Sequence, residues 1–284
     1  MIQDILPKKY DNQYHDYLPE EKDTVLVYHK GQVLLRHYAD GRIAYPTWKE
    51  IHAPKEAGTY LFSIDKERFF LASWMDIEVP AGYELSDTRT FRYAEPKYCA
   101  FAGITGFQLY RWYKEHRFCG KCSSALVKDK KERMLKCPHC GTMVYPIISP
   151  AVIVAVIDSK ENKILLSKYS GRGSYAHFAL IAGFTEIGET IEETVHREVM
   201  EEVGLKVKNL KFYKSQPWSF SGTLLFGFFA ELDGASKIHL DENELAMAGF
   251  YSPEEVLLDD AQISLTREMM AQFKNGYNPY REEE

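Results

Sequence analysis

Four of the five cysteines in this chain stand in two closely spaced pairs. Cys119, Cys122, Cys137 and Cys140 form the pattern C-x2-C-x14-C-x2-C. Each C-x2-C pair fits a tight turn that directs two thiolates to one point, and two such turns close a tetrahedral site for Zn²⁺. Gly141 supplies the glycine that a knuckle turn needs. The sequence therefore predicts a zinc ribbon, and because four thiolates leave no open position for water, its zinc should be structural.

Two other uses of these cysteines stay open. They could form two disulfides, which a reducing compartment disfavours, or a redox pair, for which the surrounding sequence has no thioredoxin-like pattern. His139 lies inside the second pair and is expected to be exposed rather than a fifth ligand. Cys99 lies outside the motif, and we expect an ordinary small apolar residue there.

The composition indicates a globular, net-acidic protein. Its 284 residues carry 35 Lys+Arg and 41 Asp+Glu, a formal net charge of −6, and 45% of them are hydrophobic. This composition supports packed cores and argues against a wide nucleic-acid-binding face, so an anionic substrate would need metal ions or local basic residues. No apolar run approaches the roughly 18 residues of a membrane span, and residues 1–10 lack a secretory signal. We expect a cytoplasmic protein with no membrane partner.

Three strand-turn-strand patterns set the organisation of the chain. They cover residues 24–36, 60–74 and 152–168, and each has β-branched or aromatic residues on both sides of a polar turn. The first two precede the cysteine motif and the third follows it. The likeness among the three patterns hints at a duplication. A helix is also predicted over residues 96–116.

These patterns predict an α+β protein of three parts. The expected parts are an N-terminal α+β domain (residues 1–115), the zinc ribbon (residues 116–146) and a C-terminal domain (residues 147–284). Between the cysteine pairs, residues 128–133 are strongly charged, and we interpret them as the solvated tip of the ribbon. The alternative is a nucleic-acid contact, but acidic residues interrupt the basic run and no aromatic residue interleaves it.

A second helix is predicted after Thr190. Thr190 and Glu193 form a capping box, and Gly204 is placed to end the helix. Its buried stripe recurs every four residues: Ile191, Val195, Val199 and Val203. Glu193 also stands four residues before Arg197, the favourable order for an ion pair along a helix. Both ends and the buried face of this helix therefore follow from the sequence.

Three carboxylates stand beside that stripe. Glu198, Glu201 and Glu202 project from consecutive turns, where like charges repel one another and destabilise the helix. Hard divalent cations such as Mg²⁺ or Mn²⁺ prefer clustered carboxylate oxygens and would compensate the repulsion. The alternative is an acidic helix face in contact with water, which is common.

The pattern around this helix resembles the Nudix box, G-x5-E-x7-R-E-U-x-E-E-x-G-U, in which U is aliphatic. Its fixed positions are Gly183, Glu189, Arg197, Glu198, Val199, Glu201, Glu202, Gly204 and Leu205. Nudix enzymes hydrolyse a diphosphate linked to another moiety. The resemblance implies a Nudix fold for the C-terminal domain, an α/β/α sandwich with a mixed sheet.

Ten residues beyond the box, SQPW resembles the specificity motif of the NADH pyrophosphatase subfamily. A four-cysteine ribbon directly before the catalytic domain is also the layout of that subfamily, so the resemblance covers residues from about 118 onward. The family motif usually continues as SQPWPFP, but here Ser219 and Ser221 replace two prolines. The loop loses two fixed φ angles, which puts the substrate preference in question.

The resemblance assigns roles to individual residues. It implies Arg197, Glu198, Glu201 and Glu202 as catalytic residues. It implies Glu198, Glu202, Glu244 and the backbone carbonyl of Ala182 as ligands of Mg²⁺ or Mn²⁺, with Glu201 as a further ligand or a base. The implied substrate contacts are Phe184, Tyr145, Glu132, Thr266 and a loop made of Gln216, Pro217, Trp218, Ser219, Phe220, Ser221, Gly222 and Thr223.

The implied reaction is metal-assisted hydrolysis of the diphosphate of NAD(H), which yields nicotinamide mononucleotide and AMP. Metal ions would neutralise the diphosphate oxygens and lower the pKa of a water, whose proton Glu201 or Glu202 accepts. Removal of NAD caps from RNA, or hydrolysis of ADP-ribose or a nucleotide sugar, would use the same residues. A non-enzymatic nucleotide sensor is the alternative of another class. We also expect a homodimer.

Overall fold

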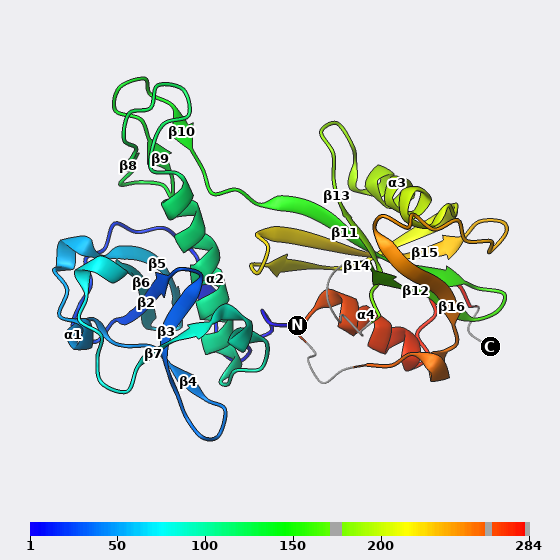
Figure 1. Ribbon diagram of the computed structural model, residues 1–284, viewed down its shortest axis with the longest axis horizontal. Coiled ribbons are helices and arrows are strands. Elements are labelled where there is room, and N and C mark those ends of the chain that lie inside the picture. Colours follow the sequence, from blue (N-terminus) through cyan, green and yellow to red (C-terminus); the bar gives the residue numbers. More distant parts are fainter. Residues whose placement is uncertain (171–177, 259–262, 282–284) are drawn as a thin grey trace. The chain divides into compact units, whose positions relative to one another are not determined.

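The computed structural model describes residues 1–170, 178–258 and 263–281. They divide into two compact units (Figure 1). Residues 2–147, together with 219–221, form the first unit, and the described residues of 148–218 and 222–281, together with Met1, form the second. Among the described residues, no helix has the length and apolar composition to span a membrane.

The first unit contains a seven-stranded sheet, and its chain contains four short helical turns and one long helix. The sheet has the order β1 (Tyr10–Asp11), β5 (Thr59–Ile64), β6 (Glu67–Ser73), β2 (Thr24–His29), β3 (Gln32–His37) and β4 (Ile43–Ala44), and β7 (Glu84–Asp87) pairs with β3. The short turns are α1 (Trp48–Ile51), η1 (Lys55–Ala57), η2 (Trp74–Asp76) and η3 (Thr88–Arg92), and the long helix is α2 (Lys97–Glu115).

The predicted hairpins and helix of this unit are confirmed. β2 turns into β3 at Lys30 and Gly31, and β5 turns into β6 at Asp65 and Lys66. Helix α2 begins after Pro96, as the sequence predicts. Apolar residues of β2, β5 and β6 pack with Trp48 and Ile51 of α1, and so the short helix turn closes one edge of the core.

The ribbon follows α2 in the same unit. Its three short strands pair in the order β10 (Met143–Val144), β9 (Leu135–Lys136) and β8 (Val127–Lys128). The prediction of a solvated tip is wrong in part. Arg133 donates hydrogen bonds to the backbone carbonyls of Asn12 and Leu61, and Tyr14 donates to the carbonyl of Asp129. These contacts fix the ribbon to the N-terminal sheet, because Leu61 lies in β5 and Asn12 directly follows β1.

The second unit is a mixed sheet between two helices. The sheet has the order β14 (Val207–Trp218), β15 (Thr223–Leu232), β11 (Ser149–Asp158), β12 (Lys163–Tyr169) and β16 (Leu245–Tyr251), and β13 (Ile181–Phe184) pairs with β11. The two helices are α3 (Ile191–Val203) and α4 (Leu265–Lys274), and η4 (Pro253–Glu255) is a short 3₁₀ turn. The predicted hairpin of β11 and β12 is confirmed.

Side-chain alternation along β11 builds a core on each face of this sheet. Ile153 and Ile157 pack with residues of α4, including Met269. Val152 and Val154 face the other way and pack with residues of α3. Figure 1 shows α3 and α4 on opposite faces of the sheet. The expected α/β/α sandwich with a mixed sheet is therefore confirmed.

The two units share a strand arrangement. In each, two hairpins join edge to edge through a parallel pair, β2 with β6 in the first unit and β11 with β15 in the second. The order β5-β6-β2-β3 thus matches β14-β15-β11-β12. The helix between the hairpins differs: it has 4 residues in α1 and 13 in α3. This match supports the duplication that the three strand-turn-strand patterns suggest.

Candidate functional site

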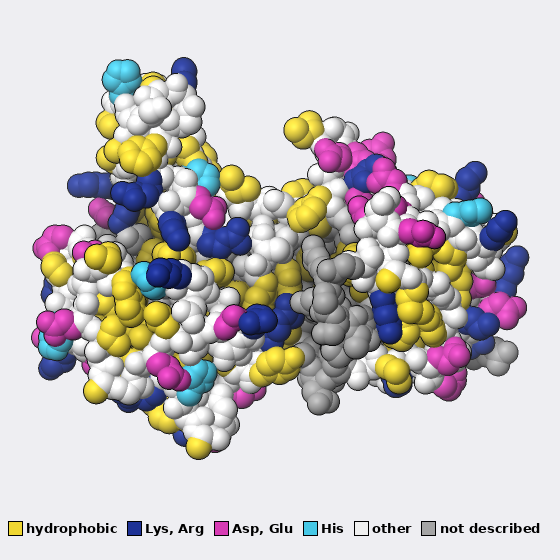
Figure 2. All heavy atoms as spheres, viewed as in Figure 1, with side chains coloured by type: hydrophobic (Ala, Val, Ile, Leu, Met, Phe, Trp, Pro, Cys, Tyr) yellow, Lys and Arg dark blue, Asp and Glu magenta, His cyan; other side chains and the backbone are white. Residues whose placement is uncertain are grey.

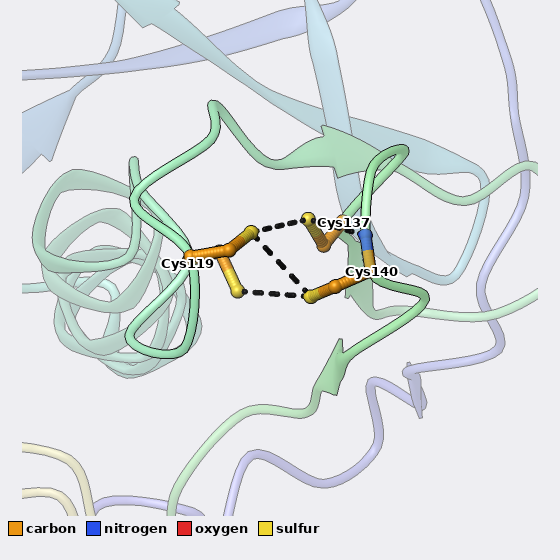
Figure 3. Close-up of side chains that lie close together, drawn as sticks. Cys119, Cys137 and Cys140 are labelled. Atoms are coloured by element: carbon orange, nitrogen blue, oxygen red, sulfur yellow. Dashed lines mark hydrogen bonds between the residues drawn. The ribbon is translucent and has the colours of Figure 1, made fainter.

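The four motif cysteines converge in the ribbon (Figure 3). All four Sγ atoms lie within 4.8 Å of one another. The Cys122–Cys137 pair is 3.4 Å apart, the Cys122–Cys140 pair 3.5 Å and the Cys119–Cys140 pair 3.6 Å. A disulfide would need about 2.05 Å, whereas four thiolates about 2.3 Å from one zinc ion lie about 3.8 Å apart. The donor set therefore fits a tetrahedral Zn²⁺ ion and does not fit disulfides.

A turn in each cysteine pair directs a backbone N–H to the first thiol of that pair. The backbone N–H of Lys121 points to Sγ of Cys119, and the N–H of Cys140 points to Sγ of Cys137, each at 3.4 Å. Gly141 adopts a φ of 75°, the left-handed conformation that its position in the motif predicts. Donors aimed at sulfur stabilise the thiolate form that binds metal.

Helix α3 carries the candidate catalytic residues, and its ends lie where the sequence places them. Thr190 and Glu193 form the capping box, and Gly204 ends the helix with a φ of 66°. The predicted ion pair between Glu193 and Arg197 is wrong. The carboxylate of Glu193 accepts a hydrogen bond from the backbone N–H of Thr190. Because this carboxylate caps the helix, it does not pair with Arg197.

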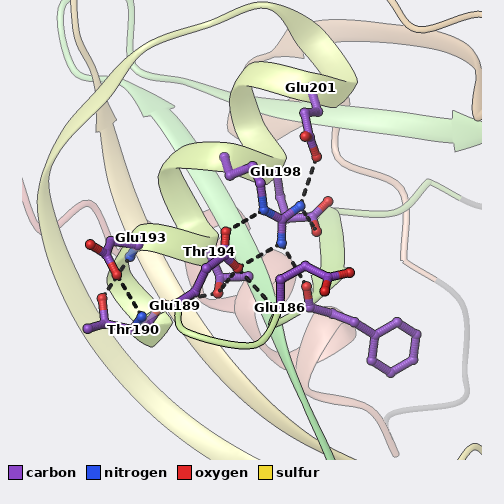
Figure 4. Close-up of polar contacts among 9 residues, drawn as sticks. Glu186, Glu189, Thr190, Glu193, Thr194, Glu198 and Glu201 are labelled. Atoms are coloured by element: carbon purple, nitrogen blue, oxygen red, sulfur yellow. Dashed lines mark hydrogen bonds and ion pairs between the residues drawn. The ribbon is translucent and has the colours of Figure 1, made fainter.

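Arg197 instead joins the helix to the loop before it. Figure 4 shows the carboxylates of Glu189, Glu198 and Glu201 directed toward one another. The guanidinium of Arg197 donates to Glu189 at 2.6 and 3.0 Å, to Glu198 at 2.7 Å, to Glu201 at 2.8 Å and to the carbonyl of Phe184 at 2.8 Å. These hydrogen bonds lower the pKa of Glu189 to about 2. One side chain therefore fixes three carboxylates and the end of β13.

Two candidate metal ligands on α3, Glu198 and Glu202, are buried. Glu198 is 8% exposed and Glu202 is 2% exposed, whereas the side chain of Glu201 is 58% exposed. Burial raises the pKa of Glu198, although Arg197 opposes the shift. Burial, with the nearby charges of Glu198 and Glu244, raises the pKa of Glu202 to about 8. The structure thus brings all four glutamates into electrostatic contact.

Glu202 lacks a partner for either carboxylate oxygen. Among the described residues, neither oxygen makes a hydrogen bond of acceptable geometry. The backbone N–H of Ala182 lies near enough to oppose the rise in the pKa of Glu202, but it does not satisfy either oxygen. An unpaired carboxylate this deeply buried is costly unless a cation binds it.

The close approach of Glu198 explains why the first position of the box, Gly183, must be a glycine. A Cβ atom at Gly183 would lie 1.9 Å from Cδ of Glu198 and 2.1 Å from each carboxylate oxygen. Real Cβ atoms do not approach other atoms this closely. Gly183 therefore leaves the space that the Glu198 carboxylate occupies beside β13.

The expected loop of residues 216–223 is shorter in the structure. Gln216, Pro217 and Trp218 belong to β14 and Thr223 begins β15, so only residues 219–222 form the turn. Gln216 is fully buried, and its amide group binds the carbonyl of Ile263 and the backbone N–H of Leu265. In this arrangement the Gln216 amide holds the start of α4, next to Thr266.

The remaining predicted substrate contacts lie in both units. Phe184 is 57% exposed at the end of β13 in the second unit. Tyr145 and Glu132 belong to the first unit, where the Tyr145 hydroxyl donates a hydrogen bond to the Glu132 carboxylate at 2.9 Å. Residues 219–221 group with the first unit and the rest of the 216–223 segment with the second.

Sequence reasoning missed the role of Glu189 and Thr194. The Thr194 hydroxyl and the backbone N–H of Glu186 both donate to Glu189, which fixes the carboxylate that anchors Arg197. Glu189 was identified only as a fixed position of the box. Glu189 lies before the helix and eight residues from Arg197, whereas helical side-chain pairs are three or four residues apart. Helical periodicity therefore could not predict this pair.

Comparison with known proteins gives two domain matches. Residues 148–273 match the NUDIX domain, and residues 114–145 match the NADH pyrophosphatase zinc ribbon domain. Proteins named NAD-capped RNA hydrolase NudC, from Citrobacter koseri and Salmonella typhi, are each 42% identical over 153 residues. Each alignment covers 54% of this chain and 58% of the relative, and so the chain spans little more than half the length of the curated relatives it matches.

Two solved structures show weaker likeness. A NUDIX hydrolase from Nitrosomonas europaea has a TM-score of 0.47 at 22% identity and covers 56% of this chain and 92% of that one. A NUDIX-family hydrolase from Clostridium perfringens has a TM-score of 0.36 at 16% identity and covers 44% and 95%. The domain matches coincide with the cysteine cluster and the carboxylate helix described above. The chain therefore carries a NUDIX domain behind an NADH pyrophosphatase zinc ribbon domain.

Proposed function

We propose that this protein hydrolyses the diphosphate of NAD(H) to nicotinamide mononucleotide and AMP with a divalent cation. The observation that carries the proposal is the buried Glu202 carboxylate, which has no hydrogen-bond partner and lies close to Glu198 and Glu244. Burial raises the pKa of Glu198 and of Glu202, and a bound cation would compensate the cost of burying their charged forms. The alternative of an acidic helix face in water does not fit the burial of Glu198 and Glu202.

The residues present fit a hard cation. Glu198, Glu202 and Glu244 offer carboxylate oxygens, Ala182 offers a backbone carbonyl, and Glu201 stands beside them; such oxygens suit Mg²⁺ or Mn²⁺. A bound ion of this kind neutralises diphosphate oxygens and lowers the pKa of water. The thiolate cluster is chemically different and suits a structural zinc ion. We propose two metal sites with separate roles.

The residues of the chain have distinct tasks in this proposal. Arg197 holds Glu189, Glu198 and Glu201, so it orients the site and leaves Glu202 for the metal. A carboxylate that accepts a proton from water needs access and a suitable pKa. Glu201 has the access and Glu202 the raised pKa, and each is a candidate base. The pH profiles of Glu201→Gln and Glu202→Gln would distinguish them.

A second candidate substrate is RNA that carries an NAD cap. The name of the curated relatives supports it, and so does the ribbon, in which residues 114–145 contain eight Lys and Arg against three Asp and Glu. This basic segment within an acidic chain favours contact with a polyanion. ADP-ribose and nucleotide sugars remain further candidates because Ser219 and Ser221 replace the two prolines.

The decisive experiment is a substrate screen with matched variants. NADH, NAD⁺, ADP-ribose, a nucleotide sugar and NAD-capped RNA would be incubated with Mg²⁺ or Mn²⁺ and the products separated by chromatography. Glu202→Gln should abolish hydrolysis, whereas Glu192→Gln, an exposed change on the same helix, should not. Binding of nucleotides without hydrolysis of any substrate would favour the non-enzymatic sensor.

We further propose a cytoplasmic homodimer with domains at residues 1–115, 116–146 and 147–284. Thiolate ligands persist in a reducing compartment, which supports a cytoplasmic location. Sedimentation of the full chain over a concentration series would test the dimer. Limited proteolysis with mass spectrometry of the fragments would test the domain boundaries.

A further inference from the structure

A cavity of about 350 Å³ lies within the first unit, where the ribbon meets α2 and the N-terminal sheet. Leu71 comes from β6, Tyr113 comes from the last turn of α2, and Leu126 and Leu135 come from the ribbon. The other lining residues include His116, Arg117 and Phe118, which follow the end of α2. The volume falls in the range of about 300–1,000 Å³ that is typical of small-molecule sites. The cavity contains none of the residues of the proposed catalytic site.

One part of the cavity wall is apolar and aromatic. Phe118 lines it and is 62% exposed, an unusual position for a phenylalanine, and Tyr113 lies on the same wall. The backbone of Phe118 forms a bridge to Ala125, so the ring starts from a fixed point of the first cysteine knuckle. The guanidinium of Arg117 lies over the Phe118 ring, 5.8 Å from its centre, so the exposed ring and a cation stand together at the cavity. An exposed aromatic ring is a surface on which a planar base can stack.

The other part of the wall is cationic. Arg117, His116 and Lys128 line the cavity, and its lining contains no Asp or Glu. The ammonium group of Lys128, an exposed residue, donates to the hydroxyl of Thr59. An ammonium group has three donors, so Lys128 retains donors for a ligand.

The ribbon segment around the cavity is positively charged, like the basic side chains that line the cavity. Residues 114–145 carry five more basic than acidic side chains, in a chain whose formal net charge is −6. Figure 2 shows Lys and Arg side chains gathered around the base of the ribbon. Local positive potential on an acidic protein attracts anions to that place.

We propose that this cavity binds a nucleotide, with the base stacked on Phe118 and the phosphate held by Arg117 and Lys128. An aromatic platform beside cations and without acids matches a planar base linked to a phosphate. A fatty acid would match the apolar wall and the cations, but it gains nothing from the accessible ring. The inference goes beyond the proposed function and does not depend on it, because none of the residues of the proposed catalytic site lines the cavity.

The nucleotide has two sources, a free mononucleotide or one unit of single-stranded RNA. AMP binding would be measured by calorimetry, and binding of a short RNA with a 5′-hydroxyl, which has no diphosphate to cleave, by fluorescence anisotropy. Both use the full zinc-loaded chain without added Mg²⁺ or Mn²⁺. The variants are Phe118→Ala and Arg117→Ala. The controls are Lys121→Ala, a ribbon cation outside the cavity, and Phe212→Ala, a phenylalanine that is 58% exposed.

We expect Phe118→Ala and Arg117→Ala each to weaken binding about fivefold or more, since loss of one stacking contact costs at least this much. Lys121→Ala and Phe212→Ala should leave it unchanged, and Phe118→Trp should retain it. Zinc content, the melting temperature and NADH hydrolysis should stay at wild-type values in all variants. If both AMP and RNA bind and both depend on Phe118, the cavity is a mononucleotide site. If only RNA binds in a way that depends on Phe118, the cavity is a site for a polynucleotide.

Three results would overturn the proposal. The first is that neither ligand binds, and the second is that Phe118→Ala folds and leaves the affinity unchanged. The third is that Lys121→Ala weakens binding as much as Arg117→Ala, which would indicate attraction by net charge alone. Hydrolysis of NADH is measured separately, so failure of the proposed catalytic function would not resemble any of these results.

Discussion

The close contact between Gly183 and Glu198 leads to the sharpest prediction. In Gly183→Ala the new Cβ would lie 1.9 Å from Cδ of Glu198, whereas an ordinary contact is at least 3.4 Å. The carboxylate must therefore move by about 1.5 Å. A displacement of about 1 Å at a catalytic group can cost roughly 10²-fold in rate, so we expect kcat for NADH hydrolysis to fall by at least that factor. Overpacking should cost about 1–3 kcal/mol of stability.

The assay is steady-state hydrolysis of NADH at saturating Mg²⁺, together with thermal unfolding. Gly249→Ala is the matched control, because a Cβ atom there meets its nearest neighbour at 3.4 Å and the residue lies in β16 of the same unit. The control should keep both activity and stability. A folded Gly183→Ala protein with wild-type kcat would show that Glu198 does not act from the position in the structure.

Three further predictions concern the metal sites. In metal-free protein, the pKa of Glu202 is raised from its ordinary value of 4.5 to about 8, so the free energy of unfolding should fall as the pH rises from about 4.5 to about 8; chemical denaturation should show this slope in wild type and a weaker one in Glu202→Gln or with Mg²⁺. Chelation of the divalent cation should abolish turnover while zinc, measured by elemental analysis, stays bound; full activity in excess chelator would refute two separate sites. Cys119→Ser should lose zinc and melt at a lower temperature, whereas Cys99→Ala should keep its zinc.

Local sequence signals predicted the elements correctly. Thr190 and Gly204 fix the ends of α3 through contacts within a few residues, and the polar turns at Lys30 and Asp65 fix two hairpins. The cysteine spacing predicted the thiolate cluster for the same reason, because each pair sits on one turn. Such features depend on short stretches of chain, and these are visible in the sequence.

The failures share a different cause, competition among partners that only the folded chain brings together. Glu193 could either cap the helix or pair with Arg197, and in the folded chain it caps the helix. Arg197 then found Glu189 and the Phe184 carbonyl across the loop. Arg133 was expected in water, but carbonyls from distant segments accept its protons. The sequence contains these groups and does not show their distances.

The contacts of Arg133 bear on how the protein is made. Its guanidinium binds the carbonyl of Asn12, which is 121 residues earlier in the chain. At a synthesis rate of roughly 5–20 residues per second, a ribosome needs about 6 to 24 s to cover that distance. During this interval the N-terminal sheet leaves the exit tunnel without its hydrogen bonds to Arg133. Arg133 belongs to the ribbon, a segment that needs zinc to fold. The contacts that Arg133 makes with Asn12 and Leu61 can therefore form only after the ribbon has been synthesised and has folded around its zinc.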